Sequence, residues 1–158
     1  MSRPVSDHGA SGYRTSIAQA PIDPAAVLAL VGDPADGAVL LFLGTVRDNA
    51  DGRHVGGLRY EAYQEMAEDE LNRITEEAVR RLGTDRVAVV HRVGDVSVGE
   101  VSVAIAVSSP HRAEAYQASR FIIEEIKKRL PVWKHERYED GEAVWVQGQA
   151  LEPTEGAR

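Results

Sequence analysis

The sequence predicts an α+β domain with a mixed, mainly antiparallel sheet and two long helices. Two observations predict this class. Several stretches show the apolar runs or the two-residue alternation of strands, and two longer stretches repeat apolar residues every three or four positions, as helices do. Hairpin-like strand pairs dominate the second half of the chain, which favours antiparallel pairing over a purely parallel sheet.

The beginning of the chain predicts a tail followed by a short helix. Residues 1–20 are rich in Ser, Gly, Ala and Pro and lack an apolar period, so we expect a loose tail. Residues 23–33, "DPAAVLALVGD", predict a short helix, because Asp23 suits the N-cap and Pro24 the first helical position.

Two strands should follow this helix. The nearly continuous apolar run "GAVLLFLGTVR", residues 37–47, predicts a buried strand. The polar residues 48–57 predict a mobile turn region. Residues 58–63, "LRYEAY", alternate as a half-exposed strand does.

The middle of the chain predicts the first long helix and two strands. Residues 64–82 form the helix, which Gly83 should end. Its buried face should carry Leu71, Ile74, Ala78 and Leu82. Residues 86–94 and 100–109 are rich in β-branched side chains and predict two strands joined by a turn region.

The second long helix and a closing hairpin complete the domain. Ser109 is the expected N-cap, Pro110 the first helical residue, and Pro131 the end of the helix. Its buried stripe should carry Ile122, Ile126 and Leu130. Residues 132–147 predict a hairpin around the turn "EDG".

The length and composition limit what this protein does. The 158 residues suit one domain, expected over residues 21–148, with tails at 1–20 and 149–158. The absence of cysteine excludes disulfides and a thiolate nucleophile, and the five histidines lack metal-site spacing, so no metal or cofactor is expected. No membrane span or leader is evident, which predicts a cytoplasmic protein. A net charge of −7 argues against a general nucleic-acid binder.

One segment departs from this acidity. Residues 126–137, "IKKRLPVWKHER", carry five cations and one acid, a net charge of +4, which leaves −11 for the rest of the chain. Lys127 follows the apolar Ile126 and should leave its helix at the edge of the buried face. Burial and nearby cations lower a lysine pKa and make it a useful base or nucleophile. The alternative is a lysine whose stem covers the core while its ammonium stays in water.

Two further sites can be interpreted either as ligand contacts or as ordinary surface side chains. His111 and Arg112 lie in the first turn of the second long helix, where cations suit a bound anion beside free backbone amides. They could equally point to solvent. Arg47 follows Gly44 at a strand end, and it is either a ligand contact or an ordinary surface arginine.

The helix length constrains how these residues combine. Arg112 and Lys127 are fifteen residues apart on one predicted helix, a rise of about 22 Å. They cannot hold one small ligand within a single chain. Either the two sites are separate, or a symmetric dimer brings the start of one helix to the end of the other.

Four blocks together resemble one known family. "FLGTVRDN", "LRYEAYQEMA", "HRVGDVSVGEVSVAIAVSSPHR" and "K…PVWKHE" resemble, in this order, the large, catalytic subunit of molybdopterin synthase, the MoaE family. The resemblance runs from about Ala38 to Val146 and implies an α/β-hammerhead fold. It implies an enzyme that inserts two sulfurs into cyclic pyranopterin monophosphate to form the dithiolene of molybdopterin.

The resemblance also implies partners. The sulfur would arrive as a thiocarboxylate on the C-terminal Gly-Gly of a small ubiquitin-like subunit, in a heterotetramer built on a central homodimer of large subunits. A partner that supplies the sulfur would explain a sulfurtransferase without cysteine. The phosphorylated pterin and the thiocarboxylate are both anions, which would explain the basic segment.

The resemblance assigns roles to particular residues. Lys127 matches the essential lysine of the family and Lys134 its second active-site lysine. Substrate-binding roles fall on Thr45, Val46, Arg47, His111, Arg112, Lys134, His135 and Glu136. His135 departs from the family pattern, since a lysine or arginine is common there. Lys127 would either move protons or capture the activated carboxyl group. A non-catalytic docking module for a ubiquitin-like partner is the alternative function.

Overall fold

The computed structural model describes residues 6–7, 12–138 and 143–147, which form two sheets and three helices. The first sheet has the order β1-β2-β6-β8-β3, where the strands are β1 (Ser6–Asp7), β2 (Arg14–Ala18), β6 (Arg86–Arg92), β8 (Val101–Ser109) and β3 (Ala38–Thr45). Within it β2 and β6 are parallel, and the other pairs are antiparallel.

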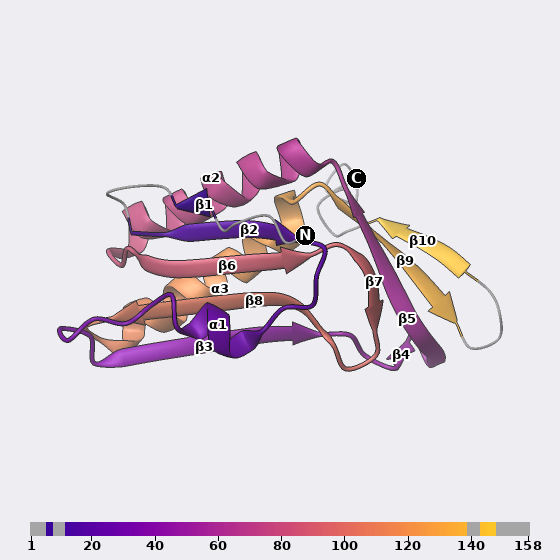
Figure 1. The fold of residues 1–158 in the computed structure, drawn as a ribbon, viewed down its shortest axis with the longest axis horizontal. Coiled ribbons are helices and arrows are strands. Elements are labelled where there is room, and N and C mark those ends of the chain that lie inside the picture. The colour runs from indigo at the N-terminus through magenta and orange to yellow at the C-terminus, as the bar shows by residue number, and fades with distance from the viewer. Residues whose placement is uncertain (1–5, 8–11, 139–142, 148–158) are drawn as a thin grey trace, which may run out of the picture.

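Within the described residues the second sheet also has five strands, and it lies beyond one end of the first (Figure 1). Its order is β10-β9-β5-β4, with β7 also pairing with β5; the strands are β10 (Ala143–Gln147), β9 (Val132–Tyr138), β5 (Arg53–Ala62), β4 (Asn49–Ala50) and β7 (Gly94–Ser97). The predicted α+β class with mainly antiparallel pairing is confirmed, and the strands divide into two sheets.

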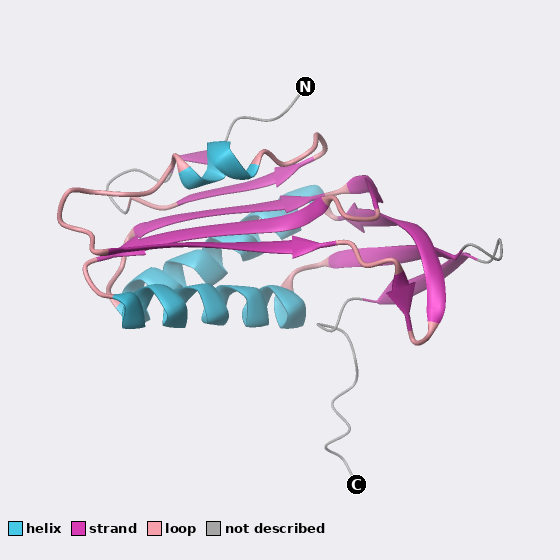
Figure 2. Cartoon of the chain, turned by 90° about the horizontal axis from the view of Figure 1, so that it is seen from below, coloured by secondary structure: helices cyan, strands magenta, loops and turns pink. Residues whose placement is uncertain are grey.

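Three helices cover the first sheet. The long helices α2 (Gln64–Leu82) and α3 (Arg112–Arg129) pack on one face, and α1 (Pro24–Leu28) lies on the other (Figure 2). The main core lies under α2 and α3, and a smaller cluster lies under α1. Asp23 accepts a hydrogen bond from the Ala25 amide at the start of α1, as expected of an N-cap.

The predicted face of α2 is confirmed. Leu71, Ile74 and Ala78 are fully buried. Gly83 ends the helix in the left-handed region, with φ +70°, and its amide donates to the Val79 carbonyl. The closing hairpin is confirmed by the β9–β10 pairing, although its turn lies outside the described residues.

The expectation of a loose tail over residues 1–20 is wrong for β2. This strand pairs in parallel with β6, and alternate residues Tyr13, Thr15 and Ile17 are buried. Tyr13 and Ile17 belong to the core under α2. Burial of this apolar surface stabilises an ordered strand where the polar composition suggested none.

Two expectations about where elements begin and end also need correction. The polar residues 48–57 contain β4 and the start of β5, joined through Asp51 and Gly52, which both have positive φ, as a tight hairpin requires. Helix α3 begins after His111 rather than Ser109, because β8 continues to Ser109, where it pairs with Ala38.

Strand β3 is an edge strand rather than a buried one. Its apolar run is continuous because Leu40 and Phe42 pack under the long helices while Leu41 and Leu43 pack under α1. Among the described strands, β3 has a neighbour only on its β8 side, and Val39 is 55% exposed.

Candidate functional site

A pocket of about 140 Å³ opens where the second sheet meets the ends of β3 and α3. It is lined by Phe42, Gly44, Thr45, Val46, Arg47, Asn49, Ala50, Val55, Leu58, Tyr60, Ser102, Val103, Ile123, Lys127, Lys134 and Glu136. Two larger hollows on the second sheet, of about 380 and 360 Å³, contain none of the predicted site residues. The smaller pocket is therefore the candidate site.

Lys127 projects from the last turn of α3 into this pocket. The preceding Ile126 is 5% exposed and anchors the helix end in the core. Lys127 is exposed as a whole residue, although the surrounding protein partly desolvates its ammonium group. This desolvation lowers the pKa of Lys127, and the positive charges of Lys134 and Arg47 lower it further. A lowered pKa increases the fraction of neutral amine, which is the form of lysine that can act as a base or nucleophile.

Lys134 and Glu136 reach the pocket from alternate positions of β9. Lys134 Nζ lies 3.5 Å from Glu136 Oε1, and Glu136 is only 7% exposed. The Tyr138 hydroxyl donates a second hydrogen bond to the Glu136 carboxylate. Two partners therefore hold this buried carboxylate, which in turn holds the ammonium of Lys134 at the pocket.

His135 lies between these two residues and does not line the pocket. Successive side chains of a strand point to opposite faces, so a strand that directs Lys134 and Glu136 inward directs His135 away. The predicted substrate contact of His135 therefore finds no support in the single chain.

The end of β3 supplies Thr45, Val46 and Arg47. The Val46 amide donates to the Glu100 carbonyl at 3.0 Å, and its carbonyl accepts from the Gly99 amide at 2.8 Å, so Val46 is fixed and 4% exposed. Thr45 and Arg47 are exposed at the pocket mouth. Gly44 is needed just before them, because a Cβ there would lie 2.6 Å from Val103 Cγ1.

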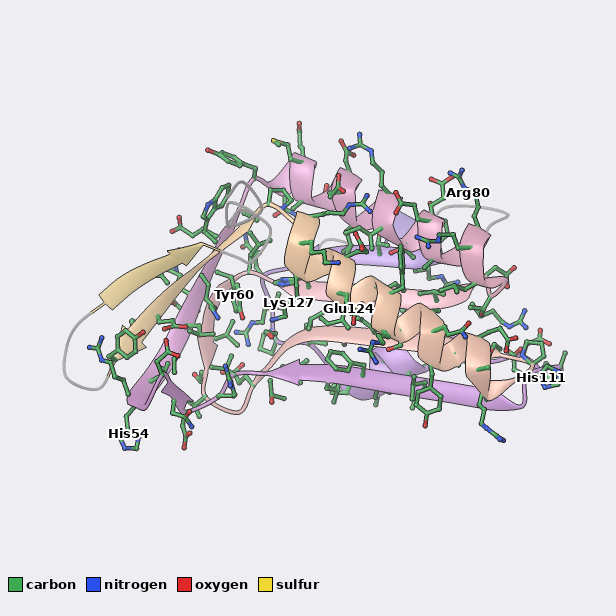
Figure 3. All side chains as sticks on the ribbon, turned by 180° about the vertical axis from the view of Figure 1, so that it is seen from behind. His54, Tyr60, Arg80, His111, Glu124 and Lys127 are labelled. Carbon is green, nitrogen blue, oxygen red and sulfur yellow. The ribbon has the colours of Figure 1, made fainter. Side chains whose placement is uncertain are left out.

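His111 and Arg112 lie at the opposite end of α3. Figure 3 shows His111 and Lys127 at the two ends of this helix, and both His111 and Arg112 are exposed. Within one chain they do not meet the pocket, as the helix length predicted. The predicted site residues thus divide into a group of six in the pocket and the distant pair His111 and Arg112, with His135 in neither.

Sequence reasoning missed three polar members of the pocket lining, Asn49, Tyr60 and Ser102. Tyr60 is partly buried, and its hydroxyl lies beside Ser102 on the pocket wall. Their strands are about forty residues apart in the sequence, and only the packing of the second sheet against the first brings them together. The alternation in "LRYEAY" could have placed Tyr60 on the same face as the buried Leu58, but not in a pocket.

The charges of the pocket suit an anion. Arg47, Lys127 and Lys134 line it with a single carboxylate, Glu136, which is already engaged. Within residues 6–7, 12–138 and 143–147, no three His, Cys, Asp or Glu side chains cluster as metal ligands would. No described helix is long and apolar enough to cross a membrane.

The fold and the pocket define a class: a two-sheet α+β protein with a pocket lined by Arg47, Lys127, Lys134 and one carboxylate. Comparison with known proteins identifies the family within this class. The chain belongs to the MoaE protein family, whose profile matches residues 17–129. This membership confirms the resemblance seen in the sequence blocks.

Individual relatives agree with this assignment. The molybdopterin synthase catalytic subunit of Halalkalibacterium halodurans is 46% identical over 141 residues, 89% of each chain. The crystal structure of molybdopterin synthase from Staphylococcus aureus matches with a TM-score of 0.76 and 39% identity, over 82% of this chain and 94% of that one. A complex of subunits 1 and 2 of molybdopterin-converting factor from Helicobacter pylori 26695 shares the fold, with a TM-score of 0.66 and 23% identity over 84% and 89% of the chains.

Proposed function

We propose that this chain is the catalytic subunit of a molybdopterin synthase. It transfers sulfur from the C-terminal thiocarboxylate of a small ubiquitin-like subunit to cyclic pyranopterin monophosphate, and so forms the dithiolene of molybdopterin. The observation that carries this proposal is the convergence of Arg47, Lys127 and Lys134 on one pocket in a member of the MoaE family. A phosphorylated substrate and a thiocarboxylate are both anions and both suit these cations.

Lys127 has the central role in the proposed mechanism. The thiocarboxylate sulfur forms a bond to a carbon of the pterin side chain while a carbon–oxygen bond at that carbon breaks and the leaving oxygen takes up a proton. The acyl–sulfur bond then breaks. Either water or the neutral amine of Lys127 attacks the acyl carbon in that second step. The lowered pKa of Lys127 increases the fraction of neutral amine, which serves as base or nucleophile.

The other pocket residues bind and orient the substrates. Arg47 and Lys134 bind anionic groups and stabilise negative charge that develops during transfer. Thr45 lies at the mouth, and Val46 keeps the Arg47 backbone in place through its two hydrogen bonds. Glu136 fixes Lys134.

His111 and Arg112 complete the pocket across a homodimer. Strand β3 begins beside the start of α3, where Ala38 pairs with Ser109, and ends at Thr45 in the pocket. An antiparallel pairing of its open edge with β3 of a second copy would place the partner copy's β3 start near this chain's pocket. The partner copy's helix start would then lie beside the end of α3. Two such pockets and two small subunits make the heterotetramer. The cytoplasmic location expected from the sequence stays a prediction.

The test is dithiolene formation from cyclic pyranopterin monophosphate with a thiocarboxylated small subunit. We expect product with the wild type and its loss with Lys127→Ala. Lys128→Ala is the matched control, because Lys128 lies next in the chain but its side chain is 67% exposed, with Nζ 3.9 Å from Glu125 Oε1. Partner binding without product from the wild type would favour the docking-module alternative. Full activity of Lys127→Ala would keep the function and overturn the choice of lysine.

A further inference from the structure

The inner wall of the pocket carries two neutral hydroxyl groups that the proposed roles leave unused. The pocket mouth holds the exposed Thr45 and Arg47, whereas Ser102 and Val103 of the inner wall are 8% and 5% exposed. Tyr60 lies beside Ser102 on this inner side. A ligand that enters past the cations therefore meets the hydroxyls in the least hydrated part of the pocket.

The Tyr60 ring is held firmly. Its strand, β5, is paired on both sides at this residue, with Lys134 of β9 and with Gly94 of β7. The ring packs edge-on against His91, with centroids 5.4 Å apart and an interplanar angle of 84°. His91 is 7% exposed and is itself held by a 2.8 Å hydrogen bond between Nδ1 and the Arg92 carbonyl. The hydroxyl position is thus set before any ligand binds.

Rotation of the Ser102 hydroxyl makes the Tyr60 proton available to a ligand. Ser102 Oγ donates to the Gly44 carbonyl at 3.2 Å, which leaves its lone pairs able to accept from the neighbouring Tyr60 hydroxyl. A serine hydroxyl can rotate and donate to Tyr60 instead. After that rotation the Tyr60 oxygen accepts from Ser102, and the phenolic proton can be donated to a ligand oxygen. Each of the two hydroxyls then still has a hydrogen-bond partner.

The phenol also stays protonated. Burial raises the pKa of Tyr60, and the negative charge of Glu136 raises it further. The group is therefore a neutral donor across the working range of an enzyme. Figure 3 shows Tyr60 and Lys127 close together between the second sheet and the end of α3, so a donor and a base face the same space.

We propose that the Tyr60 hydroxyl donates a hydrogen bond to the acyl oxygen of the small subunit's C-terminal group, with Ser102 and His91 as positioning residues. This inference rests on the proposed function. When water or the Lys127 amine attacks the acyl carbon, the carbonyl π electrons move to this oxygen, which becomes an oxyanion. These electrons re-form the carbonyl when the acyl–sulfur bond breaks and the sulfur leaves attached to the pterin. The Tyr60 proton stabilises the oxyanion and is not transferred.

The test removes only the hydroxyl. Tyr60→Phe keeps the ring that packs on His91, and we expect kcat to fall about 10- to 100-fold, with KM for the pterin changed less than about threefold. Affinity for the small subunit in its ordinary carboxylate form should fall about 3- to 10-fold by calorimetry. Affinity for a small subunit that lacks its last two glycines should not change. Ser102→Ala should give a smaller loss of kcat in the same direction.

Tyr63→Phe is the matched control, because Tyr63 is 62% exposed and packs on Trp133 outside the pocket. Equal thermal stability of both Phe variants would exclude a folding defect. A Tyr60→Phe variant with wild-type kcat and wild-type tail-dependent affinity overturns the inference and leaves the function intact. If the wild type forms no product, but Tyr60→Phe still loses the tail-dependent affinity, the proposed chemistry fails and the Tyr60 contact stands. If the wild type binds the small subunit equally well with and without its last two glycines, both the Tyr60 contact and the proposed function are overturned.

Discussion

Lys134 and Glu136 form an ion pair on the wall of the candidate pocket, with Nζ and Oε1 3.5 Å apart. The side chain of Lys134 is 30% exposed, whereas that of Glu136 is 9% exposed. The pair therefore joins a buried anion to a cation that can still reach a ligand. Removing either member should change a different property of the protein.

Replacement of Glu136 by Gln should mainly reduce stability. The amide keeps an acceptor for the Tyr138 hydroxyl but loses the charge that attracts Lys134. We expect a loss of about 1 kcal/mol, or about 3 °C in Tm, measured by thermal unfolding. Glu124→Gln, which removes an exposed pair with Arg120, should cost far less. Equal losses in the two variants would show that burial of Glu136 has no energetic consequence.

Replacement of Lys134 by Gln should move the pH dependence of catalysis. The charge of Lys134 helps to lower the pKa of Lys127, so its removal raises that pKa towards the usual value of 10.5. Less neutral amine is then present at a given pH, and the rise of kcat with pH should shift to higher pH. The pH profile of acetic anhydride labelling at Lys127 checks the same shift directly. Lys128→Gln should leave both profiles in place, and a shift to lower pH in Lys134→Gln would contradict this account.

Local patterns in the sequence allowed the helices to be predicted, whereas the three pocket cations were assigned through the family resemblance, because local spacing left their roles open. The apolar period and Gly83 define α2, and the position of Lys127 beside Ile126 already placed its ammonium at the edge of the core. The alternation of side chains along β9 follows from the sequence, and it could have shown that His135 and Lys134 point to opposite faces of the sheet.

Other features depend on contacts between distant segments. Strand β2 has too few apolar residues to be predicted alone and is ordered by its pairing with β6. Tyr60 and Ser102 become neighbours only when the two sheets pack together. Ser109 has the composition of an N-cap, but its backbone completes β8, and this pairing delays the start of α3. Local propensity is a weak guide where tertiary pairing uses the same residues.

Stability should depend on pH through His91. Burial lowers the pKa of His91 to about 4, and the charge of Lys127 acts in the same direction. Between pH 6.5 and 4 the unfolded chain binds a proton at this residue while the folded chain does not. Stability should therefore fall as the pH decreases through this window, by at most about 3 kcal/mol from His91.

Urea unfolding of the wild type and His91→Asn at several pH values measures this effect. The variant should show a shallower decline between pH 6.5 and 4, whatever its stability at pH 7. His54→Asn is the control, because His54 is exposed on the β4–β5 hairpin (Figure 3), and it should keep the wild-type slope. Parallel curves for the wild type and His91→Asn would show that His91 is protonated in the folded state.

The open edge of β3 should be the dimer contact. Val39 is 55% exposed on this edge, and a charge there disfavours strand pairing between copies. Val39→Lys should lower the dimer fraction in light scattering and reduce activity. Leu28→Lys introduces the same charge at the exposed Leu28 of α1, on a different surface, and should leave the dimer intact. A fully dimeric, fully active Val39→Lys variant would place the interface elsewhere.

Mixing of two inactive variants tests whether the pocket is shared. A Lys127→Ala variant lacks the proposed base or nucleophile. A variant with both His111→Ala and Arg112→Ala lacks the two side chains at the helix start, which α3 holds far from Lys127 in the same chain. If each pocket takes Lys127 from one copy and the helix start from the other, a mixed dimer contains one intact pocket and one that lacks both contributions. Random reassembly of equal amounts makes half of the dimers mixed, so about a quarter of wild-type activity should return. If each pocket used only its own chain, every pocket in the mixture would lack one contribution and no activity would return. The separation of the two ends of α3 within one chain favours the first result.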